Sequence, residues 1–100
     1  MRILIPVMKN SKDTEISLHF GHAPFFAIFD TTNNELIFEK NILIHNNPEK
    51  SAVDQAIELF KPQKVLVNNI GQKAKNIFES KNIELKTGVK GLLSDLDFIK

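Results

Sequence analysis

The residues best suited to chemistry lie in one short segment of the chain. Residues 17–26 read Ser-Leu-His-Phe-Gly-His-Ala-Pro-Phe-Phe, which places His19 and His22 three positions apart, on either side of Gly21. A neutral imidazole is a common metal ligand, and a turn would bring both rings to one side. Gly21 permits a positive φ, and Pro24 keeps the chain extended before the next strand. The segment predicts a shaped loop with two presented imidazoles, or one imidazole packed on a phenylalanine and one in solvent.

Any metal site of this chain must use histidines or carboxylates as its ligands. The chain has no cysteine and three histidines, the third being His45. The absence of cysteine excludes disulfides, thiol catalysis and cluster ligation by the chain's own thiolates. His19 and His22 alone do not complete a tetrahedral site, which needs about four ligands. One chain therefore offers a metal only a few imidazole and carboxylate ligands, unless a dimer shares histidines.

The same segment resembles the signature of a known family. Residues 17–26 are similar to the pattern Ser-x-His-Phe-Gly-basic-Ala-Pro-aromatic-Phe of the dinitrogenase iron–molybdenum cofactor biosynthesis family, which includes NifX, NafY and the C-terminal domain of NifB. The resemblance continues in residues 3–7, an opening strand with a proline, and in the Asn-Ile-Gly turn at residues 69–71. It covers nearly the whole chain, so we expect residues 1–100 to form one domain of this family.

The resemblance implies a binding protein. Family members of nitrogen fixation carry the iron–molybdenum cofactor or its iron–sulfur precursors. By position, His19 is the first candidate to contact such a cluster, and His22 stands where an Arg or Lys is common. The turn ending at Gly71 offers N–H groups and a positive helix end to an anion, or is simply a tight strand-to-helix connection. The candidate cofactor-binding residues are His19, Phe20, Gly21, His22, Asn69 and Gly71, and the candidate metal ligands are His19, His22 and His45.

Two functions follow from this resemblance. One is a small non-catalytic carrier that binds the iron–molybdenum cofactor, its iron–sulfur precursor or a related cluster transiently and without a covalent bond. The alternative is an interaction module of metalloenzyme or iron–sulfur assembly that binds no metal itself. We expect no enzymatic activity, because the sequence has no Ser-His-Asp order, phosphate loop or paired-carboxylate motif. Nuclease chemistry is also disfavoured, because the first strand has no carboxylate for a two-metal site.

The first half of the chain predicts a strand followed by a hairpin. Residues 2–8 read as a buried strand, in which Pro6 indicates an edge position, a bulge or an unpaired N–H. Residues 25–30 and 35–44 are predicted strands. The asparagine-containing turn at residues 31–34 joins them as a hairpin, because Asn tolerates the positive φ of tight turns.

The second half predicts helices that alternate with strands. We expect Asn47 to cap a first helix, with Pro48 at its first position, and Gly71 to open a second. Strands are predicted at residues 64–68 and 82–85. The inward-facing stripes of three helices are predicted from apolar residues at helical spacing: Val53, Ala56, Ile57 and Phe60; then Ala74, Ile77 and Phe78; then Leu92, Leu96 and Ile99.

Together these elements predict an α/β fold of the order β-β-β-α-β-α-β-α. We expect a mixed five-stranded sheet of strand order 3-2-1-4-5 with three helices, and right-handed crossovers that place helices on both faces. This arrangement resembles the ribonuclease-H-like motif, which the family resemblance also implies.

The charge balance limits the partners. Thirteen Lys and Arg against twelve Asp and Glu give a net charge of +1, which predicts no nucleic-acid or membrane-surface binding. The longest apolar run, residues 25–29, is far shorter than the ~20 residues of a membrane span, and no secretory signal is readable. We expect a cytoplasmic monomer or weak dimer whose partners are a metal cluster and a nitrogenase-like or cluster-assembly protein.

Overall fold

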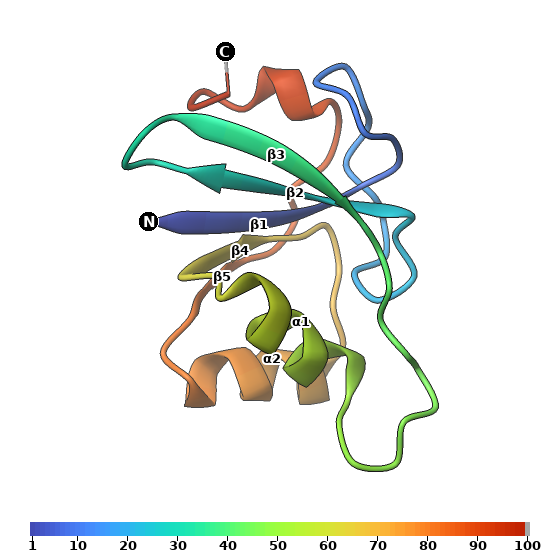
Figure 1. Cartoon of the computed structure of the whole chain (residues 1–100). Coiled ribbons are helices and arrows are strands. Elements are labelled where there is room, and N and C mark those ends of the chain that lie inside the picture. Colours follow the sequence, from blue (N-terminus) through green and yellow to red (C-terminus); the bar gives the residue numbers. More distant parts are fainter. Residues whose placement is uncertain (100) are drawn as a thin grey trace.

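The computed structural model describes residues 1–99 and arranges them as one sheet with two α-helices (Figure 1). Strands β1 and β2 pair antiparallel, as do β2 and β3, whereas β1 with β4 and β4 with β5 pair parallel. The strand order β3-β2-β1-β4-β5 is the predicted one. The elements are β1 (Arg2–Val7), β2 (Phe25–Asp30), β3 (Glu35–Lys40), α1 (Ala52–Phe60), β4 (Lys64–Leu66), α2 (Gln72–Ser80), β5 (Glu84–Lys86) and a 3₁₀ helix (Leu93–Asp95).

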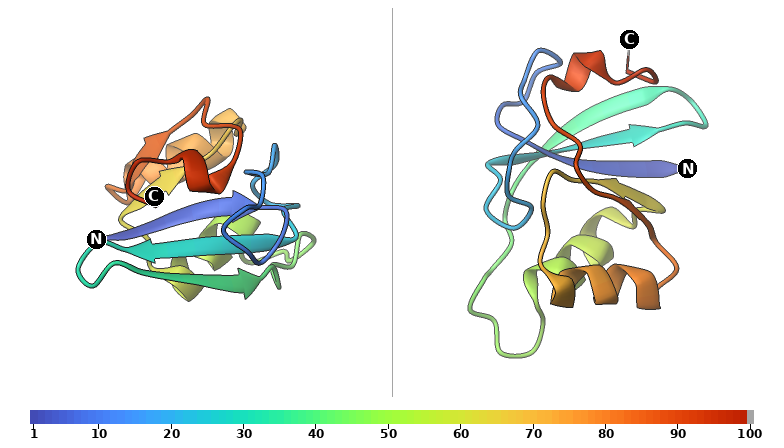
Figure 2. Two further views of the ribbon diagram at one scale, coloured as in Figure 1. Left: turned by 90° about the horizontal axis from the view of Figure 1, so that it is seen from above. Right: turned by 180° about the vertical axis from the view of Figure 1, so that it is seen from behind.

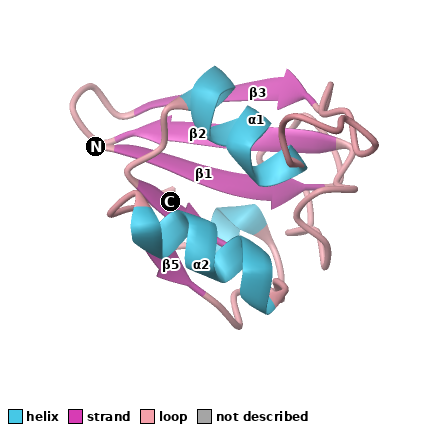
Figure 3. Cartoon of the chain, turned by 90° about the horizontal axis from the view of Figure 1, so that it is seen from below, coloured by secondary structure: helices cyan, strands magenta, loops and turns pink. Residues whose placement is uncertain are grey.

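Both α-helices cover the same face of the sheet, so the prediction of α-helices on both faces is wrong (Figures 1 and 3). Strand β3 runs in the direction of β1, β4 and β5, because β2 is antiparallel to both β1 and β3. The connections β3-α1-β4 and β4-α2-β5 therefore both step across the sheet in one direction. Right-handed crossovers that step in one direction place their helices on one face.

The predicted third α-helix is also wrong. In its place, Leu93–Asp95 forms one 3₁₀ turn, and Leu96 returns to extended backbone at φ −69° and ψ 132°. The Gly91 carbonyl accepts from the Ile16 N–H at 2.8 Å, and the Leu93 N–H donates to the Thr14 carbonyl at 2.9 Å. These bonds tie the segment to residues 14–16. The 92/96/99 apolar spacing is thus overridden by tertiary pairing, and Leu93 rather than Leu92 is buried.

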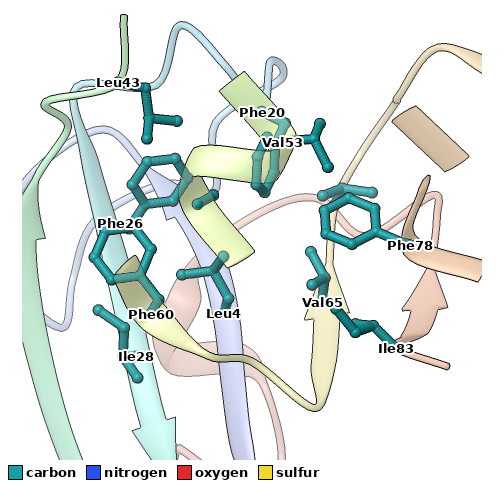
Figure 4. Close-up of a cluster of buried hydrophobic side chains, with 12 residues drawn as sticks. Leu4, Phe20, Phe26, Ile28, Leu43, Val53, Phe60, Val65, Phe78 and Ile83 are labelled. Atoms are coloured by element: carbon teal, nitrogen blue, oxygen red, sulfur yellow. The ribbon is translucent and has the colours of Figure 1, made fainter. Parts of the chain in front are cut away.

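The core lies on both faces of the sheet. Successive side chains of β1 alternate between the two faces, with Leu4 toward the helices and Ile3 and Ile5 toward the 3₁₀ segment. Figure 2 shows this C-terminal segment, in red, crossing the face opposite the helices. The helix-side cluster is aromatic at its centre, where the Phe26 ring lies 5.3 Å from that of Phe60 (Figure 4). Neither nine-residue helix of the described chain is long and apolar enough to cross a membrane.

Two predicted boundaries shift around the connection from β3 to α1. Strand β3 ends at Lys40 instead of residue 44, and α1 begins after Ser51 instead of Asn47. The Ser51 Oγ accepts the Asp54 N–H at 3.1 Å and is the true N-cap, whereas Asn47 closes an isolated turn by accepting the Glu49 N–H at 2.8 Å. Residues 41–51 therefore form a long connection, which we call the strap.

Candidate functional site

The segment that leads into the histidine motif is paired to the end of β1. Residue Val7 pairs with Phe25 of β2 on one side and with Ile16 on the other. The Ser17 N–H donates to the Pro6 carbonyl at 2.8 Å, and the Met8 N–H donates to the Glu15 carbonyl at 3.1 Å. Strand β4 pairs with β1 only at Ile3 and Leu4, so residues 15–17 occupy the edge beside Pro6 that β4 leaves free.

The next residues fix the backbone of the loop at residues 17–24, which we call the His loop. The buried Ser17 hydroxyl donates to the His19 carbonyl at 2.9 Å and accepts the His19 N–H at 3.2 Å. Phe20 points into the core, where its ring lies 5.2 Å from Phe26 and 5.6 Å from Phe78 (Figure 4). His19 lies exposed between these two anchors. Phe20 thus anchors the loop through the core, and its side chain is not a free ligand group.

Gly21 and the other two histidines form a compact group. The His22 and His45 rings are stacked, with centroids 4.1 Å apart and planes inclined by 9°. A Cβ at position 21 would lie 2.9 Å from His45 Cε1. Gly21 has no positive φ, so the prediction that it supplies one is wrong. Its missing side chain instead lets the His45 ring approach the loop.

Asn41, at the start of the strap, holds the His loop from outside. Its side-chain amide donates to the carbonyls of Gly21 and Ala23 at 2.9 and 2.7 Å, and its Oδ1 accepts the Leu43 N–H at 2.8 Å. Its own backbone N–H donates to the Pro24 carbonyl at 3.1 Å. Sequence reasoning missed this residue. The predicted strand at residues 35–44 contains Asn41, so the one available signal was the general tendency of an asparagine amide to bond to neighbouring backbone.

A hollow of about 240 Å³ lies between the His loop and the start of α2. It brings together most of the predicted cofactor-binding residues, and Asn69 is not part of its lining. Gly71 is the N-cap of α2, and no side chain accepts a hydrogen bond from the first turn at that cap. The lining residues are His19, Phe20, Gly21, His22, Ala52, Val53, Ile70, Gly71 and Ala74, so no Lys, Arg, Asp or Glu contributes to it.

A larger hollow of about 470 Å³ is also lined by His19 and His22. Three exposed apolar side chains, Met8, Leu18 and Leu92, contribute to its lining. The bridge between Glu15 and Leu92 holds its two walls together. His19 and His22 therefore line both the larger hollow and the hollow at the start of α2.

The ligand supply of this region is small. Within residues 1–99, no group of three or more His, Cys, Asp or Glu side chains is placed to hold a metal ion. The carboxyl groups with lowered pKa values lie elsewhere: the Ser11 hydroxyl lowers the pKa of Asp13, and the Thr32 backbone N–H lowers the pKa of Asp30. What the site offers chemically is exposed imidazole nitrogen, apolar walls, uncapped helix N–H groups beside the smaller hollow and the Glu15 carboxylate beside the larger one.

Comparisons with known proteins agree with the fold. Residues 1–96 match the family model named dinitrogenase iron-molybdenum cofactor. The crystal structure of PH0822 superposes with a TM-score of 0.77 at 26% identity, covering 99% of this chain and 86% of that one. No curated protein matches.

Two more distant solved structures share the fold. An NMR structure of a NifB-like protein from Thermotoga, assigned to the DUF35 family, has a TM-score of 0.73 at 19% identity, over 94% of this chain and 81% of that one. The apo form of the orange protein from Desulfovibrio gigas gives 0.72 at 19% identity, over 91% and 78%. At these identities the two structures support the fold alone.

Proposed function

Because the chain belongs to the dinitrogenase iron-molybdenum cofactor family, we propose that it is a small non-catalytic carrier of a metal cluster. Its cargo is the iron–molybdenum cofactor, an iron–sulfur precursor or a related cluster, bound transiently at the His loop. His19 is the first ligand and His22 the second. This cargo is a substrate that the protein receives and passes on.

The observation that carries this proposal is the position of His19. Its ring is exposed, its backbone is fixed by Ser17, and it borders both hollows. An imidazole held this way is available to an incoming ligand without any rearrangement of the core.

The surroundings favour an anionic cluster over a bare metal ion. A bare ion needs about four ligands from the protein or water, and the described residues offer no group of even three. A cluster brings its own inorganic sulfide, which supplies most of the ligands of each iron, so it needs fewer protein ligands per metal than a bare ion does. The N–H groups at the start of α2 stabilise negative charge, and no carboxylate lines the hollow that they border. A cargo held by few protein ligands is also more easily released to a recipient protein.

Anaerobic titration of the purified chain with an iron–sulfur cluster donor, and separately with isolated iron–molybdenum cofactor, tests the proposal. We expect cluster absorption to co-elute with the parent protein in gel filtration and to disappear in His19→Ala. Because an exposed residue contributes little to stability, thermal unfolding of His19→Ala should match the parent. His45→Ala is the matched control, since it also removes one exposed imidazole, and we expect it to weaken uptake without abolishing it.

Equal uptake by the parent and His19→Ala would exclude His19 as the ligand. If neither cluster is taken up by a folded parent, the carrier proposal fails. The second candidate function is then the interaction module, which binds no metal. The exposed Met8, Leu18 and Leu92 at the larger hollow favour it, because apolar side chains gathered at one surface mark interaction sites.

A further inference from the structure

We infer that His45 is a positioning residue, and that the strap holds the His loop in its binding shape through a His22–His45 stack. This inference deepens the proposed function. Its cluster-uptake test rests on that function, whereas its test of loop order does not. The three histidines then have two roles. His19 and His22 bind the cargo, and His45 holds the His22 ring in place by stacking on it.

The geometry of the stack argues against two ligands for one ion. A metal ligated by an imidazole lies in the plane of the ring, along the lone pair of the nitrogen. The His22 and His45 planes are inclined by only 9°, with centroids 4.1 Å apart. A single ion cannot lie in two nearly parallel planes separated in this way, so joint coordination would require the stack to break.

His45 also contacts the backbone of the His loop at Gly21. The ring lies so close to Gly21 that a Cβ there would be 2.9 Å from Cε1. His45 therefore packs against the backbone of the loop as well as against the His22 ring. Because the His22 ring is stacked on a ring that also packs against Gly21, the contact restricts the conformations of the exposed loop.

Two side-chain amides hold the strap in place for this contact. Asn41, the first residue of the strap, donates its side-chain amide to the Gly21 and Ala23 carbonyls. Gln55 of α1 accepts the Ile44 N–H at 2.9 Å and donates to the Ile44 carbonyl at 2.7 Å, and also to the Lys50 carbonyl at 3.2 Å. His45 follows Ile44 directly, so its backbone is fixed from the helix. Figure 1 shows the strap, in green, descending from the end of β3 to α1.

Comparison of His45→Ala with His45→Phe tests the inference, because phenylalanine keeps a stacking ring and cannot ligate a metal. Asn46→Ala is the matched control, since Asn46 is an exposed neighbour in the strap. Asn41→Asp keeps the acceptor for the Leu43 N–H and turns a carboxylate toward the Gly21 and Ala23 carbonyls. Circular dichroism melting first checks that each variant folds.

Two readouts are needed. The first is ¹⁵N relaxation of the amides of residues 19–23 in the cargo-free protein, and the second is anaerobic cluster uptake. We expect His45→Ala and Asn41→Asp to increase loop mobility. The loss of the stack should weaken uptake by His45→Ala roughly 2- to 10-fold. His45→Phe should restore loop order and most of the uptake, and Asn46→Ala should match the parent in both.

The outcomes separate this inference from the proposed function. If His45→Phe restores loop order yet loses as much uptake as His45→Ala, then His45 is a ligand and the inference is overturned. An unchanged loop in His45→Ala also overturns it. If the parent takes up no cluster, the proposed function fails, and the relaxation data alone decide: order lost in His45→Ala and regained in His45→Phe sustains the positioning role.

Discussion

At the residue scale, the two glycines of the site differ in the space that surrounds a side chain at each position. The absence of a side chain at Gly21 leaves room for the observed position of His45, because a Cβ there would lie 2.9 Å from His45 Cε1. Gly71 is set neither by space nor by backbone angle: a Cβ at this position would meet no atom within 4 Å, and its φ is −70°. A side chain is therefore compatible with the protein itself at position 71. A glycine at position 71 would instead allow a bound cargo to approach the backbone at the start of α2 closely.

Gly71→Ser tests that explanation. Serine suits the extended N-cap backbone, and its hydroxyl can accept an N–H of the first turn, so the free energy of unfolding should stay equal or rise by a few tenths of a kcal/mol. Cargo uptake should weaken, because the hydroxyl occupies both the hollow and a helix donor. Urea unfolding and anaerobic titration measure the two effects. Undiminished uptake would show that the start of α2 does not contact the cargo.

At the element scale, the start of α1 decides how long the strap is. Asn47 followed by Pro48 is a typical N-cap and first helical residue, yet α1 begins only at Ala52. Ser51 caps it, with the Asp54 carboxylate accepting from the Ser51 hydroxyl at 2.9 Å. The later start leaves residues 41–51 free to cross beside the His loop and to bring His45 onto His22.

Ser51→Ala should lower the free energy of unfolding by about 1 kcal/mol, the usual effect of removing an N-cap. Asn47→Ala is the comparison, and we expect a smaller loss because Asn47 closes only an exposed turn. Chemical denaturation with one shared m-value gives both numbers. The reverse order of the two losses would place the helix start at Asn47.

At the scale of the whole molecule, stability comes from two clusters on opposite faces of one sheet. The helix-side cluster holds Phe20, the anchor of the His loop, together with Phe26, Phe60 and Phe78. The opposite cluster holds Ile16 and Leu93, which place the walls of the larger hollow. The loop with the candidate ligands is therefore tied to both halves of the core.

Phe60→Ala should cost about 3–5 kcal/mol, a large part of the roughly 5–15 kcal/mol that stabilises a small domain. We expect a molten or largely unfolded chain. Phe98→Ala is the control: its ring contacts Phe29 but is 37% exposed, so its loss should cost much less. Differential scanning calorimetry measures both. A Phe60→Ala melting temperature within a few degrees of the parent would contradict the assigned core.

The local pattern was sufficient for the presence of the strands and for the hairpin, although not for every strand end. Alternating and continuous apolar runs predicted β1 and β2, and the hairpin followed from its asparagines, of which Asn34 has φ 57°. These features are local, because strand periodicity and turn chemistry depend on residues close in sequence. The motif at residues 17–26 likewise indicated the family and the exposed His19.

Only the tertiary structure decided what depends on residues far apart in the chain. The last segment pairs with residues 14–16 and so does not form its predicted helix. Both helices share a face because their crossovers step in the same direction across the sheet. His45 meets His22, and Asn41 meets the Gly21 and Ala23 carbonyls, across about twenty residues of sequence. The sequence by itself determined which residues are chemically suited to the site. The packing of the strap against the His loop decided how they are held, because such contacts leave no periodic signal in the chain.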